Sequence, residues 1–140
     1  MPATLTPRVR TLVVCDGMRA SRIEENVFHL RGTRCEIRVP SFPLRRRLWL
    51  FVILSSPRPG RFPGYVKMIH DQTDRAVFYG QIEPPPLFPE DAELLPLVLP
   101  VNVRFPQAGR YTVQVWFFQE TSADILKMEQ PFYVLEREAE

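Results

Sequence analysis

Two cysteines and two histidines are the side chains of this 140-residue chain best suited to nucleophilic or metal chemistry. Cys15 is followed by Asp16 and Gly17, so a thiol nucleophile with a nearby acid is one interpretation. Such a thiol needs a base, usually histidine, and a lowered pKa, yet neither His29 nor His70 belongs to a recognisable motif. We therefore favour the other interpretation, in which Cys15 is a small core residue that precedes an ordinary turn.

Metal sites have weak support in the sequence. A zinc site would have to gather Cys15, His29, Cys35 and His70. These residues are not arranged as the two closely spaced ligand pairs of structural zinc sites. The segment 71–74 has two aspartates but lacks the Gly and the distal Glu of a calcium loop, so it predicts a hairpin turn. Phosphate-loop, serine-hydrolase, zinc-protease and Cys-x-x-Cys motifs are also missing. We expect no cofactor, no metal and no enzymatic activity.

The run Arg45-Arg46-Arg47 is the strongest local charge. It could hold an anion or phosphate, since guanidinium groups match these ligands, or it could be a solvated loop before the next strand. Both interpretations stay open. The chain has only two lysines and no RNA-binding motif, and we expect no nucleic-acid partner.

Charge is unevenly distributed along the chain. Residues 1–62 carry twelve arginines and four acidic residues, whereas residues 63–140 carry six basic and twelve acidic ones. Either the two halves interleave in one sheet structure, or the molecule is dipolar and pairs head to tail with itself.

No apolar run approaches the roughly 20 residues of a membrane span, and the start of the chain does not resemble a signal peptide. We expect a cytoplasmic protein with free thiols and no membrane contact.

Proline residues punctuate short runs of period two, which predict β-strands. In the run 33–39, Cys35 and Ile37 should face inward. The apolar run 48–54 predicts a strand buried on both faces, with Trp49 as the core tryptophan. Pro100 interrupts the run 97–105, which predicts an edge strand or a bulge.

The segment 105–117 is the clearest architectural signal. A turn with Pro106 and Gly109 precedes Tyr111, and apolar and polar residues then alternate. This pattern is typical of the tyrosine corner of Greek-key sandwiches, in which the hydroxyl bonds to upstream backbone. We predict an all-β, immunoglobulin-like Greek-key β-sandwich of about 8–10 short strands, with little or no helix. It should form a single domain over residues 1–140, with frayed ends at 1–7 and 137–140.

The proline-rich arm at residues 83–90 is the strongest candidate for a partner surface. Four large apolar side chains lie in the segment 84–95: Leu87, Phe88, Leu94 and Leu95. They could contact a protein partner or a second copy, or they could plug the open end of the sandwich. The leading functional hypothesis is a protein-interaction module that acts through this arm or an edge strand.

A small-molecule or carbohydrate binder is the alternative hypothesis. Trp116, Phe118 and Tyr133 alternate away from the expected core and could form a binding surface. A concave groove with Trp116 and polar groups would favour the binder, and a flat apolar patch around Phe88 would favour the interaction module. A paired cysteine and histidine would favour an enzyme.

Three landmarks in this order resemble an uncharacterised bacterial family of small single-domain β-sandwich proteins. They are the V-x-C-D segment at residues 13–16, the P-S-F-P segment at 40–43 and the F-P-x-x-G-x-Y segment at 105–111. The resemblance implies an all-β protein without an assigned activity. It supplies no catalytic residues. Val113 stands where an antibody domain has its second cysteine, so no inter-sheet disulfide is expected there.

Overall fold

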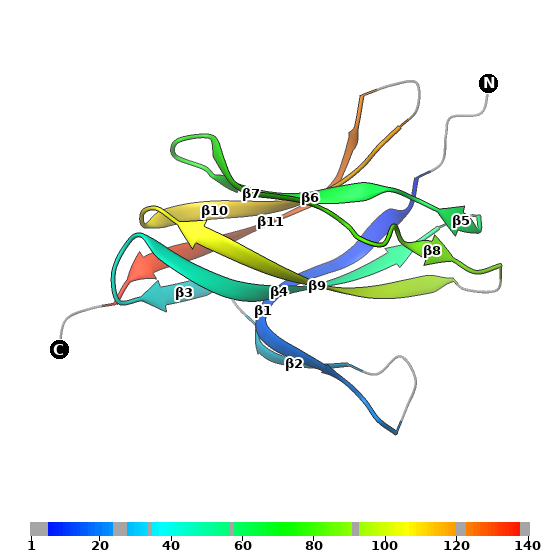
Figure 1. Cartoon of the computed structure of the whole chain (residues 1–140), viewed down its shortest axis with the longest axis horizontal. Helices are drawn as coiled ribbons and strands as arrows, with labels where there is room; N and C mark the ends of the chain where they lie inside the picture. The colour runs from blue at the N-terminus through cyan, green and yellow to red at the C-terminus, as the bar shows by residue number, and fades with distance from the viewer. Residues whose placement is uncertain are drawn as a thin grey trace.

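The computed structural model places two β-sheets face to face (Figure 1). It describes residues 6–23, 28–33, 35–56, 58–90, 93–119 and 123–137. Within these residues there are eleven strands and no helix. The predicted immunoglobulin-like β-sandwich is confirmed, and two of the eleven strands are only two residues long.

Four strands form one sheet and five form the other. The four-stranded sheet has the order β2 (Phe28–Thr33), β1 (Arg8–Ala20), β4 (Leu44–Ser55) and β9 (Leu94–Phe105). The five-stranded sheet has the order β3 (Glu36–Val39), β11 (Ile125–Glu136), β10 (Gly109–Phe117), β6 (Gly64–His70) and β7 (Arg75–Gln81). A separate ribbon pairs β5 (Gly60–Arg61) with β8 (Leu87–Phe88). The chain passes repeatedly between the sheets, as Greek-key connections require.

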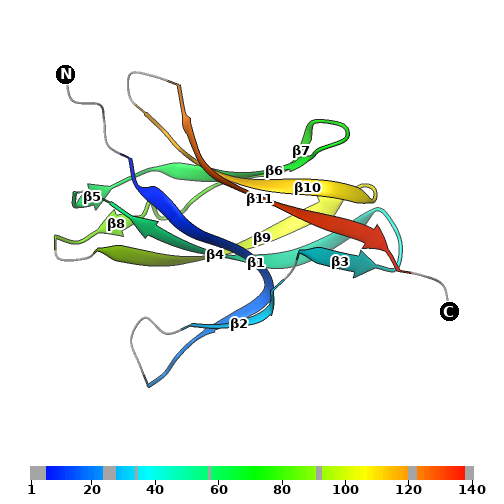
Figure 2. The same cartoon turned by 180° about the vertical axis from the view of Figure 1, so that it is seen from behind.

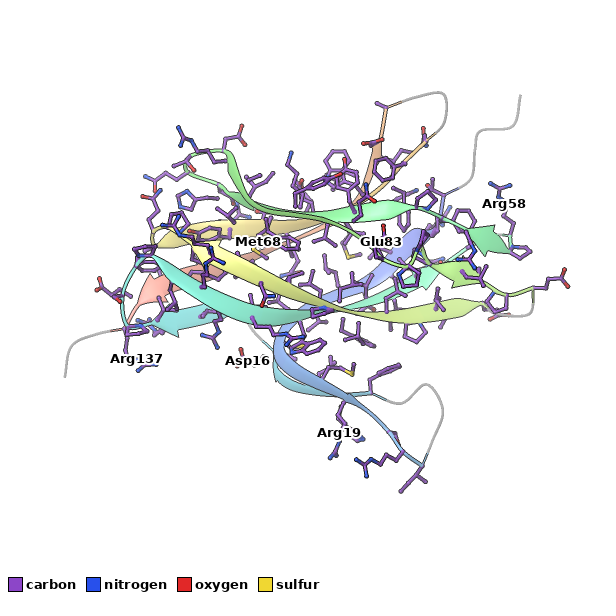
Figure 3. The ribbon with its side chains drawn as sticks, viewed as in Figure 1. Asp16, Arg19, Arg58, Met68, Glu83 and Arg137 are labelled. Atoms are coloured by element: carbon purple, nitrogen blue, oxygen red, sulfur yellow. The ribbon has the colours of Figure 1, made fainter. Side chains whose placement is uncertain are left out.

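The core lies between the two sheets, and Figure 3 shows Met68 there. Strand β4 illustrates how period two builds it. Leu48, Leu50, Val52 and Leu54 are almost fully buried, whereas the alternate residues are only half-buried. The prediction that both faces of this strand are buried is therefore wrong. Trp49 lies on the outer face, because the core-facing positions of β4 are the even-numbered ones.

The tyrosine corner is confirmed. The Tyr111 ring is fully buried, and its hydroxyl donates to the carbonyl of Gln107 at 2.5 Å. Gly109 adopts φ +143°, and a Cβ atom there would lie 2.7 Å from Nε2 of His70. Glycine therefore permits both the backbone conformation and the close approach to the buried histidine.

The prediction for Cys35 is wrong, because its side chain is exposed although Ile37 and Val39 are buried. Thr33 ends β2 in one sheet, and Glu36 begins β3 in the other. Cys35 lies in the crossover between them, where strand alternation does not apply. The prediction treats the run 33–39 as one continuous strand.

The prediction of frayed ends does not hold for the three described residues within them, Thr6, Pro7 and Arg137. Thr6 and Pro7 are buried, and the N–H of Arg137 donates to the carbonyl of Val39 at 2.6 Å. The outermost positions, 1–5 and 138–140, lie outside the described residues.

The β1–β2 hairpin leaves the four-stranded sheet on the side away from the other sheet, as the two opposite views show (Figure 2). Arg19 lies on this projecting part (Figure 3). The hairpin still touches the outer face of its own sheet, because Phe28 packs against Phe51 with 5.3 Å between ring centroids. Strand β9 forms the opposite edge, as predicted, and pairs with β4 along its whole length.

Candidate functional site

The structure divides the predicted partner segment at residues 84–95. Phe88 is only 1% exposed and packs edge-on against Phe62, so it is a core plug. Leu95 is half-buried against the core. Leu87 and Leu94, in contrast, are 50% and 57% exposed. No flat apolar patch can form around Phe88, because that ring is inside the sandwich.

The arginine run 45–47 belongs to strand β4 and not to a loop, because β4 begins at Leu44. Arg46 donates to the Asp16 carboxylate at 2.8 Å, and Arg47 lies 4.8 Å from the centre of the Trp49 ring. Arg45 pairs in register with Arg104 on β9. The three guanidinium groups therefore have different surroundings and do not form one grip.

The cysteines and histidines do not assemble into a catalytic group. The Cys15 thiol is buried and donates to the carbonyl of Trp49 at 3.4 Å. Burial, followed by the charge of Asp16, raises the pKa of Cys15, which disfavours the nucleophilic thiolate. His70 bonds to Thr73 and the backbone of Ala108. Among the residues that the structure describes, no group of three or more His, Cys, Asp or Glu side chains could hold a metal ion.

A concave polar site lies instead on the outer face of the five-stranded sheet. We name this hollow the outer groove; its volume is about 380 Å³. The lining residues come from the β6–β7 turn and from strands β6, β10 and β11: Ile69, Asp71, Asp74, Arg110, Thr112, Gln114, Glu129 and Pro131. Three carboxylates and one guanidinium make the lining acidic.

One end of the outer groove is held together around Asp71. The Thr112 hydroxyl lies 2.8 and 3.0 Å from the two carboxylate oxygens, and Arg110 donates to the same carboxylate at 2.8 Å. Asp71 begins the turn that closes β6 and β7, and Thr112 faces outward from β10. The predicted hairpin turn at 71–74 is thus confirmed, and its first carboxylate connects it to the neighbouring strand.

The middle of the groove is held together around Gln114. Its amide nitrogen donates to Glu129 at 2.7 Å, and its amide oxygen accepts the indole N–H of Trp116 at 2.9 Å. Gln114 and Glu129 are cross-strand partners. Trp116 does not line the groove, but it fixes the orientation of the Gln114 amide. Thr112 and Gln114 are both less than 10% exposed although they lie on an outer face.

Aromatic rings continue the same face beyond Gln114. Tyr65 stacks nearly parallel to Trp116 with 5.9 Å between ring centroids, and it also contacts Phe118 and Tyr79. Its hydroxyl donates to Asp124 at 3.0 Å. Burial, followed by the hydrogen bond to Asp124, raises the pKa of Tyr65 to about 12. Tyr79 is 55% exposed and offers a ring to solvent beside this cluster.

Sequence reasoning found part of this face. It placed Trp116 and Tyr133 outside the core, and Tyr133 is indeed 49% exposed. It missed the polar frame of Asp71, Thr112, Gln114 and Glu129. The alternation in β10 was a signal that Thr112 and Gln114 face outward, but their partners depend on strand register.

Comparisons with known proteins support the fold and go no further. No family model matches the sequence, and no curated protein matches it. A member of glycosyl hydrolase family 2 from Bacteroides cellulosilyticus DSM 14838 gives a TM-score of 0.50 at 12% identity, over 68% of this chain and 13% of that protein. The chain thus spans a small part of that hydrolase, and the likeness concerns the sandwich alone.

A second solved structure is the soluble domain of PmoD from Methylocystis sp. ATCC 49242 (Rockwell). It gives a TM-score of 0.39 at 11% identity, over 91% of this chain and 96% of that one. A TM-score this low supports no conclusion about the chain. The described parts of the chain contain no helix that is long and apolar enough to cross a membrane.

Proposed function

We propose that the protein is a non-enzymatic binding protein for a small polyhydroxylated molecule, with a carbohydrate as the ligand class. The observation that carries this proposal is the outer groove, in which buried Thr112 and Gln114 are fixed by partners from the β6–β7 turn and from strand β11. A frame whose side chains are already oriented loses little conformational entropy when a ligand binds.

The chemistry of the lining suits sugar hydroxyls. Carboxylates such as Asp74 and Glu129 accept hydrogen bonds from hydroxyl groups, and the Arg110 guanidinium donates to hydroxyl oxygens. Ligand sites in general combine apolar walls with a few oriented polar groups. Ile69 and Pro131 provide such apolar surface, and the exposed Tyr79 ring lies on the same face.

Titration of the labelled protein with a panel of monosaccharides and disaccharides, followed by NMR, tests the proposal. At least one sugar should shift the resonances of Thr112 and Gln114, and Gln114→Ala should weaken its binding about tenfold or more, as expected for a lost oriented hydrogen-bonding group. Asn102→Ala removes an exposed amide from the other sheet and should change nothing. A panel that leaves the groove resonances unmoved, or equal weakening by both variants, would count against the proposal.

Exposed Leu87 and Leu94 favour a second candidate function, the protein-interaction module. Both side chains are at least half exposed; Leu87 lies on β8 of the β5–β8 ribbon, and Leu94 begins β9. If this surface mediates self-association, the double variant Leu87→Ser/Leu94→Ser should remain folded and stay monomeric at concentrations where the wild type associates. Sedimentation velocity measures this. A wild type that is monomeric throughout removes the support for self-association.

The cytoplasm remains the proposed compartment. It is supported by two free cysteines, of which Cys15 is fully buried as a thiol.

A further inference from the structure

A second hollow runs along the open side of the sandwich, between the edge strands β7 and β9. Figure 1 views the molecule from this side, and β7 and β9 contact each other across the two sheets. We name it the lateral crevice. Its wide end has a volume of about 780 Å³ and is lined by Thr73, Arg75, Ala76, Val77, Arg104, Pro106 and Gln107.

The crevice continues as a narrower hollow between the same two strands. This part has a volume of about 180 Å³ and is lined by Val66, Phe78, Gly80, Gln81, Ile82, Glu83, Leu99, Pro100 and Val101. Along β7 the lining passes from Arg75 to Phe78, and along β9 it passes from Arg104 to Leu99. The two hollows therefore follow one another in the same direction on both strands.

The wide end is cationic. Arg75 comes from the five-stranded sheet and Arg104 from the four-stranded sheet, and no carboxylate lines this part of the crevice. Neither guanidinium forms an ion pair or hydrogen bond with another described residue. Arg45 does not line the crevice, but it lies directly across from Arg104 in the β4–β9 ladder. Like charges in register repel each other, so an anion placed here would relieve the repulsion.

Buried His70 orients two residues that line the wide end, Thr73 and Gln107. Its Nε2 lies 3.2 Å from the carbonyl of Ala108, which can only accept, so Nε2 is the donor. The Gln107 amide nitrogen, which can only donate, lies 3.4 Å from Nδ1, so Nδ1 is an acceptor, and the Thr73 hydroxyl lies 2.9 Å from it. The Thr73 hydroxyl proton is used in this contact. The Gln107 amide keeps a second N–H that can donate to a ligand beside the two arginines.

The narrow end is largely apolar. Phe78 and Leu99 are partly buried against the core, and Val101 is buried. The only charged residue here is Glu83, which follows β7 and so lies at the end away from Arg75. A carboxylate at that position repels anionic groups, so the narrow end is better suited to apolar atoms.

We propose that the lateral crevice binds a small amphiphilic oxyanion, with its phosphate or carboxylate between Arg75 and Arg104 and its apolar tail beside Phe78 and Leu99. Guanidinium groups bind both kinds of head in a bidentate manner. This site is separate from the outer groove, and its ligand is an anion where the groove suits a neutral molecule.

Calorimetric titrations with inorganic phosphate, hexyl phosphate and hexanoate test the proposal on the intact chain. Hexyl phosphate should bind at least about tenfold more tightly than inorganic phosphate, because the tail buries several methylene groups. Binding of hexyl phosphate alone indicates a phosphate head, and binding of hexanoate as well indicates a general oxyanion site; both results support the proposal. Equal affinity for inorganic phosphate and hexyl phosphate would overturn it.

Matched charge variants test the head. Arg75→Gln/Arg104→Gln should weaken hexyl phosphate binding at least about tenfold, since charge-assisted contacts are the strongest in the site. Arg58→Gln/Arg61→Gln removes the same charge from exposed positions at β5 and should have little effect. Equal weakening by both pairs would show general electrostatic attraction and overturn the site. Sugar binding in the outer groove should persist in both variants, so the two proposals fail independently.

Discussion

Asp71 and Asp74 of the β6–β7 turn line the outer groove, whereas Thr73 and Arg75 line the lateral crevice. One short turn thus separates an acidic hollow from a basic one. In the groove, Asp71 already has Arg110 and Thr112 as partners. In the crevice, Arg75 has no such partner among the described residues.

The two hollows differ in how far their charged groups are already paired. Arg110 neutralises the Asp71 carboxylate, which mainly holds neighbouring strands in place, whereas Asp74 and Glu129 keep the groove acidic. Unpartnered guanidiniums keep their full charge for a ligand. Binding of an anion in the crevice should therefore weaken strongly with added salt, whereas binding of a neutral sugar in the groove should not.

The variant His70→Ala should have the largest effect on stability, because it affects both hollows. His70 is 1% exposed, ends strand β6 directly before Asp71 and anchors Thr73 and Gln107 of the crevice. Its loss leaves a cavity and removes three polar contacts. We expect the free energy of unfolding to fall by about 3 kcal/mol, as for other buried large-to-small changes. Urea denaturation followed by fluorescence measures this.

His29→Ala is the matched control for that prediction. His29 is exposed on β2, so its loss should change the unfolding free energy by less than about 0.5 kcal/mol. Similar losses in both variants would mean that the His70 contacts do not organise the turn.

The variant Asp71→Asn should affect the groove and spare the crevice. It removes the charge that Arg110 and Thr112 bind, so unfolding should become easier by about 1.5 kcal/mol. Asp74→Asn makes the same chemical change in the same turn, at φ 55°, a conformation that asparagine tolerates. Because Asp74 is exposed and lacks these partners, its variant should match the wild type in urea denaturation. Equal destabilisation would contradict the assignment of Asp71 as the anchor.

The variant Tyr111→Phe should loosen the crevice and leave the groove unchanged. The lost hydrogen bond ends on Gln107, which lines the crevice. We expect a cost of about 1 kcal/mol in unfolding free energy, the net value of a typical hydrogen bond. Thermal unfolding gives the stability, and the NMR resonances of Gln107 and Thr112 separate the two hollows. A shift at Thr112 as large as that at Gln107 would contradict the separation.

The fold could be predicted where the sequence signal is local. Tyr111, Gly109 and the alternation along β10 lie within one short segment, and the tyrosine corner followed from them. The predictions for Cys35 and Trp49 are wrong because they rest on the same local alternation and on nothing else. Alternation gives two faces, but it does not say where a strand ends or which of two apolar faces meets the other sheet.

The candidate sites depend on contacts between distant segments. Asp71 meets Thr112, and Arg75 shares a hollow with Arg104, only because β6 pairs with β10 and β7 lies beside β9. Strand order and register determine these meetings, and a single sequence does not contain them. The sequence did place Trp116 outside the core, but not the hydrogen bond that makes it useful to the groove.

The smallest expected effect concerns the aromatic end of the groove and appears only at high pH. The pKa of Tyr65 is raised from 10.0 to about 12 in the folded protein. Below pH 10 the phenol is neutral in both states, and its contribution to stability is fully present. Between pH 10 and about 12 the unfolded chain releases this proton and the folded protein keeps it, so stability falls as the pH rises.

Comparing urea unfolding of the wild type and Tyr65→Phe at several pH values isolates this contribution. The stability of the wild type should fall more steeply through that window, because phenylalanine has no proton to release. Absorbance titration of the phenolates should also lose its highest-pH component in the variant. Parallel stability curves would mean that Tyr65 is solvated like a free phenol. The aromatic end of the groove would then be open to water, like the arginines of the crevice, and the contrast between the two hollows would be confined to the Asp71 end.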